Sequence, residues 1–85
     1  MSKQEEIRAA LEAAFAPRNL EVINESHQHA GHAGHDGSGE SHFRVRIAAA
    51  AFKDMSRVAR HRAVHAALGK DLVSQIHALA LEISA

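Results

Sequence analysis

The seven residues from 42 to 48, HFRVRIA, constrain this fold more than any other stretch of the chain. Phe43, Val45 and Ile47 fall on one face of an extended segment, and the histidine and arginines between them fall on the other. Strict alternation of this kind predicts a β-strand with one buried side and one solvent-facing side. The buried side needs a covering layer, so the chain is expected to form a sheet packed against helices.

Two further segments predict strands of the same sheet. In residues 20–25, Leu20 and Val22 alternate with Glu21, and residues 77–84, HALALEIS, place leucine and isoleucine opposite alanines. The strand over 20–25 is expected to pair with 42–48 as an antiparallel hairpin. Its connection, 26–41, is longer than the two to five residues of most hairpins, and long loops of compact domains often carry function.

The N-terminal residues predict an amphipathic helix. Ser2 is followed three residues later by Glu5, which fits a capping box, and apolar residues then recur at helical spacing. Pro17 cannot continue a helix. A helix is therefore expected over 3–15.

Two more helices are expected between the second and third strands. Ser56 is placed to cap a helix over 57–68, and Gly69 is placed to end it. Asp71 is placed to cap a short third helix. The residues of the longer helix expected to face inward are Val58, Val64, Ala67 and Leu68, and the shorter helix is expected to run through Leu72, Val73 and Ile76.

The predicted fold class is α+β, with the order α-β-β-α-α-β. Because the last connection contains helices, the third strand is expected to run parallel to the second through a right-handed crossover. The result is a three-stranded mixed sheet with helices on one face, in a single domain over residues 1–85 with 26–41 as a His/Gly-rich hairpin loop. We expect the isolated chain to be a monomer or a weak homodimer.

Composition excludes several classes of protein. The chain has no cysteine, so it has neither disulfides nor thiolate metal ligands. No run of about 18 apolar residues is present, so no membrane span is expected. The acidic, amphipathic start resembles neither a signal peptide nor a transit peptide, and a cytoplasmic protein is expected. No Ser/His/Asp arrangement or telling carboxylate pair is present, so an enzyme is not expected.

Charge divides the chain into two halves. Residues 1–40 contain three basic and seven acidic residues, a net charge of −4, and residues 41–85 contain seven basic and three acidic residues, a net charge of +4. The balanced total argues against strong non-specific nucleic-acid binding, but a local basic face is possible.

The basic residues gather on the helix expected over 57–68. Arg57, Arg60 and His61 are spaced to share a face, and Arg62 projects elsewhere. This face, with two outward arginines of the second strand, is a candidate for phosphate contacts. All three phenylalanines occupy apolar-patterned positions, so there is no stacking platform for single strands. An ordinary solvated face, a surface for an acidic partner and a nucleic-acid site all remain open.

Half of the eight histidines fall within the nine residues HQHAGHAGH, at positions His27, His29, His32 and His35. Imidazole binds zinc, nickel and copper, so a loop-based metal-binding module is one interpretation. The other interpretation is a solvated loop with surplus histidines. A glycine-rich repeat fixes neither the geometry of the ligands nor the hydrogen-bond partners that a structural metal site needs.

Four motifs together resemble the BolA family, in the branch with a histidine in the hairpin loop. They are ESHQHA at 25–30, SHFRVRI at 41–47, SRVARHRAVH at 56–65 and IHALALEI at 76–83. The resemblance covers nearly the whole chain. It implies the α-β-β-α-α-β fold, similar to a class II KH-like domain without the GxxG nucleotide-gripping loop.

The resemblance also implies a function. BolA proteins pair with monothiol glutaredoxins and share a [2Fe–2S] cluster, held on one side by the glutaredoxin cysteine and glutathione and on the other by BolA histidines. Carried over by motif, these histidines are His77 of HALA and His29 of ESHQHA, with His32 as a substitute for His29. Some members are linked to DNA binding and gene regulation, which is the alternative function.

The chemistry of histidine suits this role. Two histidines replace two thiolates on one iron in Rieske centres, so a cysteine-free chain offers half a site and its partner supplies the sulfur. The alternative for His77 is a half-buried structural histidine at the open end of the core face, since it shares the parity of the apolar residues that follow it.

Overall fold

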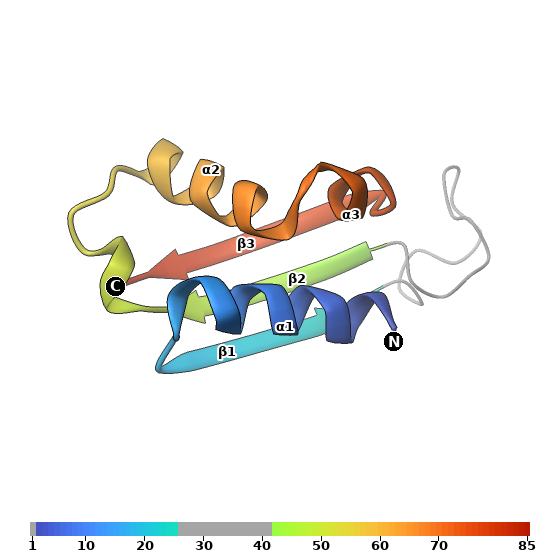
Figure 1. The fold of residues 1–85 in the computed structure, drawn as a ribbon, viewed down its shortest axis with the longest axis horizontal. Helices are drawn as coiled ribbons and strands as arrows, with labels where there is room; N and C mark the ends of the chain where they lie inside the picture. Colours follow the sequence, from blue (N-terminus) through green and yellow to red (C-terminus); the bar gives the residue numbers. More distant parts are fainter. Residues whose placement is uncertain (1, 26–41) are drawn as a thin grey trace.

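A computed structural model describes residues 2–25 and 42–85 (Figure 1). The predicted order of elements is confirmed, with one short 3-10 helix, η2, in addition. The elements are α1 (Lys3–Phe15), β1 (Asn19–Asn24), β2 (His42–Ala48), η2 (Ala50–Phe52), α2 (Arg57–Leu68), α3 (Lys70–Ser74) and β3 (Ala78–Ser84). The predicted hairpin loop over 26–41 lies outside the described residues.

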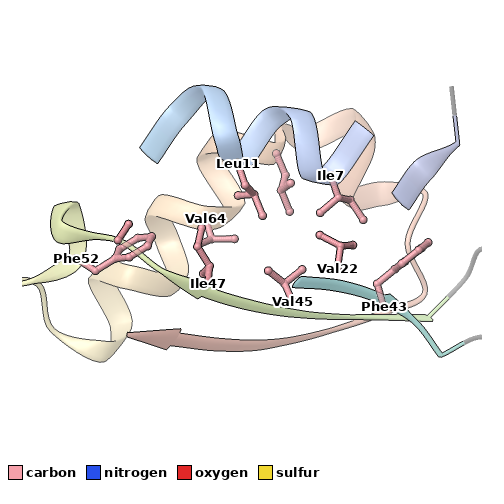
Figure 2. Packing of buried hydrophobic residues seen from close by; sticks show 10 residues of the cluster. Ile7, Leu11, Val22, Phe43, Val45, Ile47, Phe52 and Val64 are labelled. Carbon is pink, nitrogen blue, oxygen red and sulfur yellow. The ribbon is translucent and has the colours of Figure 1, made fainter. Parts of the chain in front are cut away.

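The three strands form one mixed sheet in the order β1-β2-β3, as predicted. β1 pairs with β2 antiparallel, with Val22 opposite Val45, and β2 pairs with β3 parallel, with Val45 opposite Leu81. Figure 2 shows α1 and α2 on the same side of this sheet, facing the apolar side chains of β2. The expected α+β architecture with helices on one face is therefore confirmed.

The core lies between this covered face and the helices (Figure 2). Ile7 and Leu11 of α1, Val45 of β2 and Val64 of α2 are completely buried. Phe52 of η2 is also fully buried, so the unexpected 3-10 turn contributes an apolar side chain to the core.

The capping signals in the sequence are confirmed at both long helices. The hydroxyl of Ser2 accepts a hydrogen bond from Glu5 N–H at 3.2 Å, and that of Ser56 accepts one from Ala59 N–H at 3.1 Å. Ala16 follows the last residue of α1: its N–H donates the final helical hydrogen bond, to the carbonyl of Glu12, and its left-handed backbone (φ 45°) turns the chain out of the helix. Each cap satisfies a backbone group that the helix itself leaves unpaired.

Three details of the predicted helices are wrong. Val58 is 58% exposed and does not face inward, because it lies about 120° around the helix from the buried Val64. Asp71 does not cap α3: Gly69, with φ 88°, ends α2 and directly precedes α3, so Asp71 already lies in the first helical turn. Ile76 lies beyond the end of α3.

Candidate functional site

The fold brings two histidines together at one end of the sheet. His77 lies in the bend just before β3, and its neighbour Ala78 is the strand partner of His42, the first residue of β2. The centroids of the two imidazole rings lie 5.4 Å apart, with the rings tilted by 48°. Because β2 and β3 are parallel, their first residues meet at the same end of the sheet.

His77 is exposed, so the alternative of a half-buried structural histidine is wrong. It directly precedes β3, and its ring lies beside that of the buried His42.

His42 is a site residue that the sequence analysis missed. It was expected on the solvent-facing side of its strand, but it is only 8% exposed. Its carbonyl accepts a hydrogen bond from Glu25 N–H at 2.8 Å, which fixes the backbone where β1 ends and β2 begins. A sequence signal was present: SHF and HALA each place a histidine at the start of a strand, and the two strands were expected to be parallel.

The loop histidines His27, His29, His32 and His35 lie outside the described residues, so His29 and His32 remain predictions. The two described residues that flank this segment, Glu25 and His42, are hydrogen-bonded to each other. Both flanks therefore lie at the same end of the sheet as the His77 ring.

Within residues 2–25 and 42–85, no group of three or more His, Cys, Asp or Glu side chains is arranged to hold a metal ion. The described part of the site thus consists of two imidazoles. Two neutral nitrogen donors are half of a four-coordinate site, which suits a metal whose remaining ligands come from elsewhere.

The arginines of the solvent-facing side of the sheet are paired with carboxylates. Arg44 donates to Glu25 at 3.0 Å and to Glu82 at 2.9 Å, and Arg46 donates to Glu82 at 3.3 Å. Hydrogen bonds to Glu25 and then Glu82 raise the pKa of Arg44, and hydrogen bonds from Arg44 and Arg46 lower the pKa of Glu82. These guanidinium groups already have anionic partners, which disfavours them as phosphate ligands.

The basic residues of α2 divide into structural and solvent-facing groups. Arg60 donates to the carbonyl of Phe52 at 3.0 Å and to that of Ile83 at 3.4 Å, so it joins η2 and α2 to β3. Arg57 and Arg62 are exposed, and His61 is half-buried. On the predicted shared face, the side chain of Arg57 is therefore accessible to a ligand, whereas that of Arg60 is hydrogen-bonded within the fold.

A groove of about 1120 Å³ runs between the first half of α2 and the second half of β3. Val58, Leu81 and Ile83 are among its apolar lining residues. Its charged lining is mixed, with arginines such as Arg57 and Arg62 and the carboxylates of Glu21 and Glu82. Its β3 residues begin at Leu81, four residues along the chain from His77, which is roughly 13 Å at about 3.3 Å per residue, and they extend away from it to the end of the strand. The histidine pair and this groove are thus separate candidate sites.

No helix among the described residues is long and apolar enough to cross a membrane.

Comparison with known proteins gives the family of this chain. A family model described as BolA-like protein matches residues 11–85. An uncharacterised Sinorhizobium protein is 58% identical over 86 residues, spanning the whole chain and 92% of that protein. Mouse BolA-like protein 1 is 47% identical over 76 residues, which cover 89% of this chain but only 53% of the mouse protein.

The chain is also similar to a BolA protein of known structure and to a bacterial BolA protein. The structure of BolA1 from Arabidopsis thaliana matches with a TM-score of 0.84 at 35% identity, over 99% of this chain and 92% of that one. A Haemophilus influenzae protein named DNA-binding transcriptional regulator BolA is 39% identical over 98% of this chain and 77% of that protein. The matched family model, these identities and the shared architecture lead to one conclusion: this chain belongs to the BolA family.

Proposed function

We propose that this protein is an adaptor that pairs with a monothiol glutaredoxin and shares a [2Fe–2S] cluster with it, in iron–sulfur cluster trafficking or iron sensing. The observation that carries the proposal is the exposed His77 ring at the end of the sheet, beside a second imidazole, in a chain without cysteine. A cysteine-free chain takes part in cluster binding only through nitrogen or oxygen ligands, so its partner must supply the sulfur.

His77 is the first ligand in this proposal, and His29 is the predicted second, with His32 able to replace it. Two imidazoles on one iron, with sulfur from the glutaredoxin cysteine and glutathione on the other, give the Rieske type of ligation, which raises the reduction potential. The role of this chain is to hold neutral imidazoles at an open end of the sheet. The pairing of Ala78 with His42 fixes the backbone beside His77 for that purpose.

The test is co-expression with a monothiol glutaredoxin and anaerobic purification with glutathione. We expect a heterodimer whose visible absorption and circular dichroism differ from those of the glutaredoxin homodimer. His77→Ala should remove that difference, and His65→Ala, an exposed histidine on α2, should not. A colourless chain that never joins the glutaredoxin would overturn the proposal.

A DNA-binding regulator is the second candidate, and the name of the Haemophilus relative favours it. Exposed Arg57 and Arg62 beside the groove are its best residues. The pairing of Arg44 and Arg46 with carboxylates and the zero net charge weigh against it.

The DNA interpretation predicts that binding to duplex DNA weakens steeply with salt, in proportion to the phosphates contacted. We expect little binding at moderate salt and a flat response. Tight, salt-dependent binding that Arg57→Gln and Arg62→Gln together weaken would favour the regulator instead.

A loop-based zinc- or nickel-binding module is the third and weakest candidate, and its histidines lie outside the described residues. The proposal assigns the protein no catalytic role and a cytoplasmic location.

A further inference from the structure

The function proposed above gives His42 no role as a ligand, although its ring lies beside that of His77. Polar side chains are seldom buried without a structural or chemical reason, and His42 is 8% exposed. Its ring lies beside His77, and its backbone is held on both sides, by the parallel pairing with β3 and by the hydrogen bond from Glu25.

The separation of the two rings suits a shared metal ion. With metal–nitrogen bonds of about 2.1 Å and a near-tetrahedral angle, the centroids of two ligating imidazoles lie roughly 5 Å apart. The centroids of His42 and His77 lie 5.4 Å apart. His77 is exposed, so small side-chain rotations of its ring are enough to close the remaining difference.

The two histidines also come from a rigid part of the fold. His42 begins β2 and His77 directly precedes β3, and the register between these strands is set along all seven residue pairs. Ligands carried by paired strands hold their geometry better than ligands carried by loops.

We propose that His42 is the second histidine of the His77 site, so that these two side chains together bind one metal ion. In the isolated chain this is an open two-nitrogen site for a divalent ion such as Zn²⁺. In the complex with a glutaredoxin, and resting there on the function proposed above, the same pair binds one iron of the shared cluster in place of a loop histidine.

The alternative is that His42 only packs against His77, because centroids 5.4 Å apart are also ordinary for stacked or tilted rings. Phenylalanine separates the two roles. His42→Phe keeps an aromatic ring beside His77 but removes both nitrogen atoms. His42→Gln is the companion variant, because it keeps a polar side chain at this buried position if phenylalanine does not fit.

The first experiment is a Zn²⁺ titration of the full chain in which His27, His29, His32 and His35 are replaced by glutamine. Histidine ring resonances are followed by ¹H–¹⁵N NMR. We expect the ring nitrogens of His42 and His77 to shift together at one equivalent of Zn²⁺. His42→Phe, His42→Gln and His77→Phe should each raise the Kd at least about tenfold, since even losing a supporting partner of a ligand costs 10–100-fold.

Three results would overturn the proposal. The His77 ring shifts alone, or the rings that shift are His61 and His65 of α2, or His42→Phe leaves the Zn²⁺ affinity unchanged. Circular dichroism of each variant, with the thermal midpoint, shows that the fold is intact.

The second experiment distinguishes failure of the His42 proposal from failure of the proposed adaptor function. The same loop variant is co-expressed with a monothiol glutaredoxin. If the unmodified chain forms a cluster-containing heterodimer, the loop variant should still form one, and His42→Gln should not. If the cluster is lost in the loop variant but not in His42→Gln, the role of His42 in the complex is overturned. If no variant acquires a cluster, the adaptor function fails, and the Zn²⁺ titration still decides the two-histidine site.

Discussion

At the scale of single residues, Arg60 and Arg62 differ in role although they were predicted together as nucleic-acid ligands. Arg60 bonds two carbonyls, of Phe52 and Ile83, that belong to different elements. Arg62 is exposed, and its side chain has no hydrogen bond or ion pair among the described residues. Spacing along the helix could not show this difference, because the partners of Arg60 depend on how α2 lies over β3.

We expect Arg60→Met to lower the free energy of unfolding by about 1–2 kcal/mol, since it removes the two side-chain hydrogen bonds to the carbonyls of Phe52 and Ile83. Arg62→Met is the matched control, and exposed substitutions of its kind usually change stability by less than about 0.5 kcal/mol. Urea unfolding at neutral pH measures both. Equal stability of the two variants would show that Arg60 does not join these elements.

Glu82 stabilises the fold through its ion pairs with Arg44 and Arg46. Its pKa is lowered by hydrogen bonds from Arg44 and then Arg46, so its contribution to stability is present above the unfolded pKa, near 4.3, and is lost as pH falls through the lower folded value. The wild-type chain should therefore have a higher free energy of unfolding than Glu82→Gln at pH 7, and this difference should disappear below about pH 4.

Urea midpoints of the two proteins across this pH range test the sign, with Asp54→Asn as a control for an exposed carboxylate in a turn. An advantage of wild type over Glu82→Gln that stays constant with pH would contradict the paired role of Glu82.

At the scale of elements, the end of α1 carries a conformational cost. Ala16 adopts a left-handed backbone with φ 45° and ψ 55°, which L-residues other than glycine reach at a cost of about 1–2 kcal/mol. Ala16→Gly should therefore raise the free energy of unfolding, by up to about 1 kcal/mol after the entropy of glycine in the unfolded chain is subtracted.

The matched control is Ala13→Gly, at an exposed position inside the same helix, which should lower the free energy of unfolding by about 1 kcal/mol. Thermal unfolding of both variants checks the prediction. It is wrong if the two substitutions change stability in the same direction.

The whole molecule shows what sequence patterns could and could not predict. Alternation in β2, the serine caps and the helical connection before β3 were enough to predict the fold, because each depends on neighbours along the chain or on general rules of connection. His77 was predicted as a ligand from its motif. His42 was missed because strand alternation predicts only the side of the sheet, whereas its burial depends on what packs at the end of the sheet.

The central claim is that this chain contributes histidine nitrogens to a cluster shared with a glutaredoxin, and one measurement tests it most directly. It is pulsed EPR of the reduced cluster in the purified heterodimer, which detects nitrogen atoms bound to iron. We predict nitrogen couplings from two imidazoles in the wild-type complex. His77→Ala should remove the coupling of one imidazole, and His65→Ala should remove none. A reduced cluster without imidazole couplings, in a heterodimer that forms normally, would contradict the account.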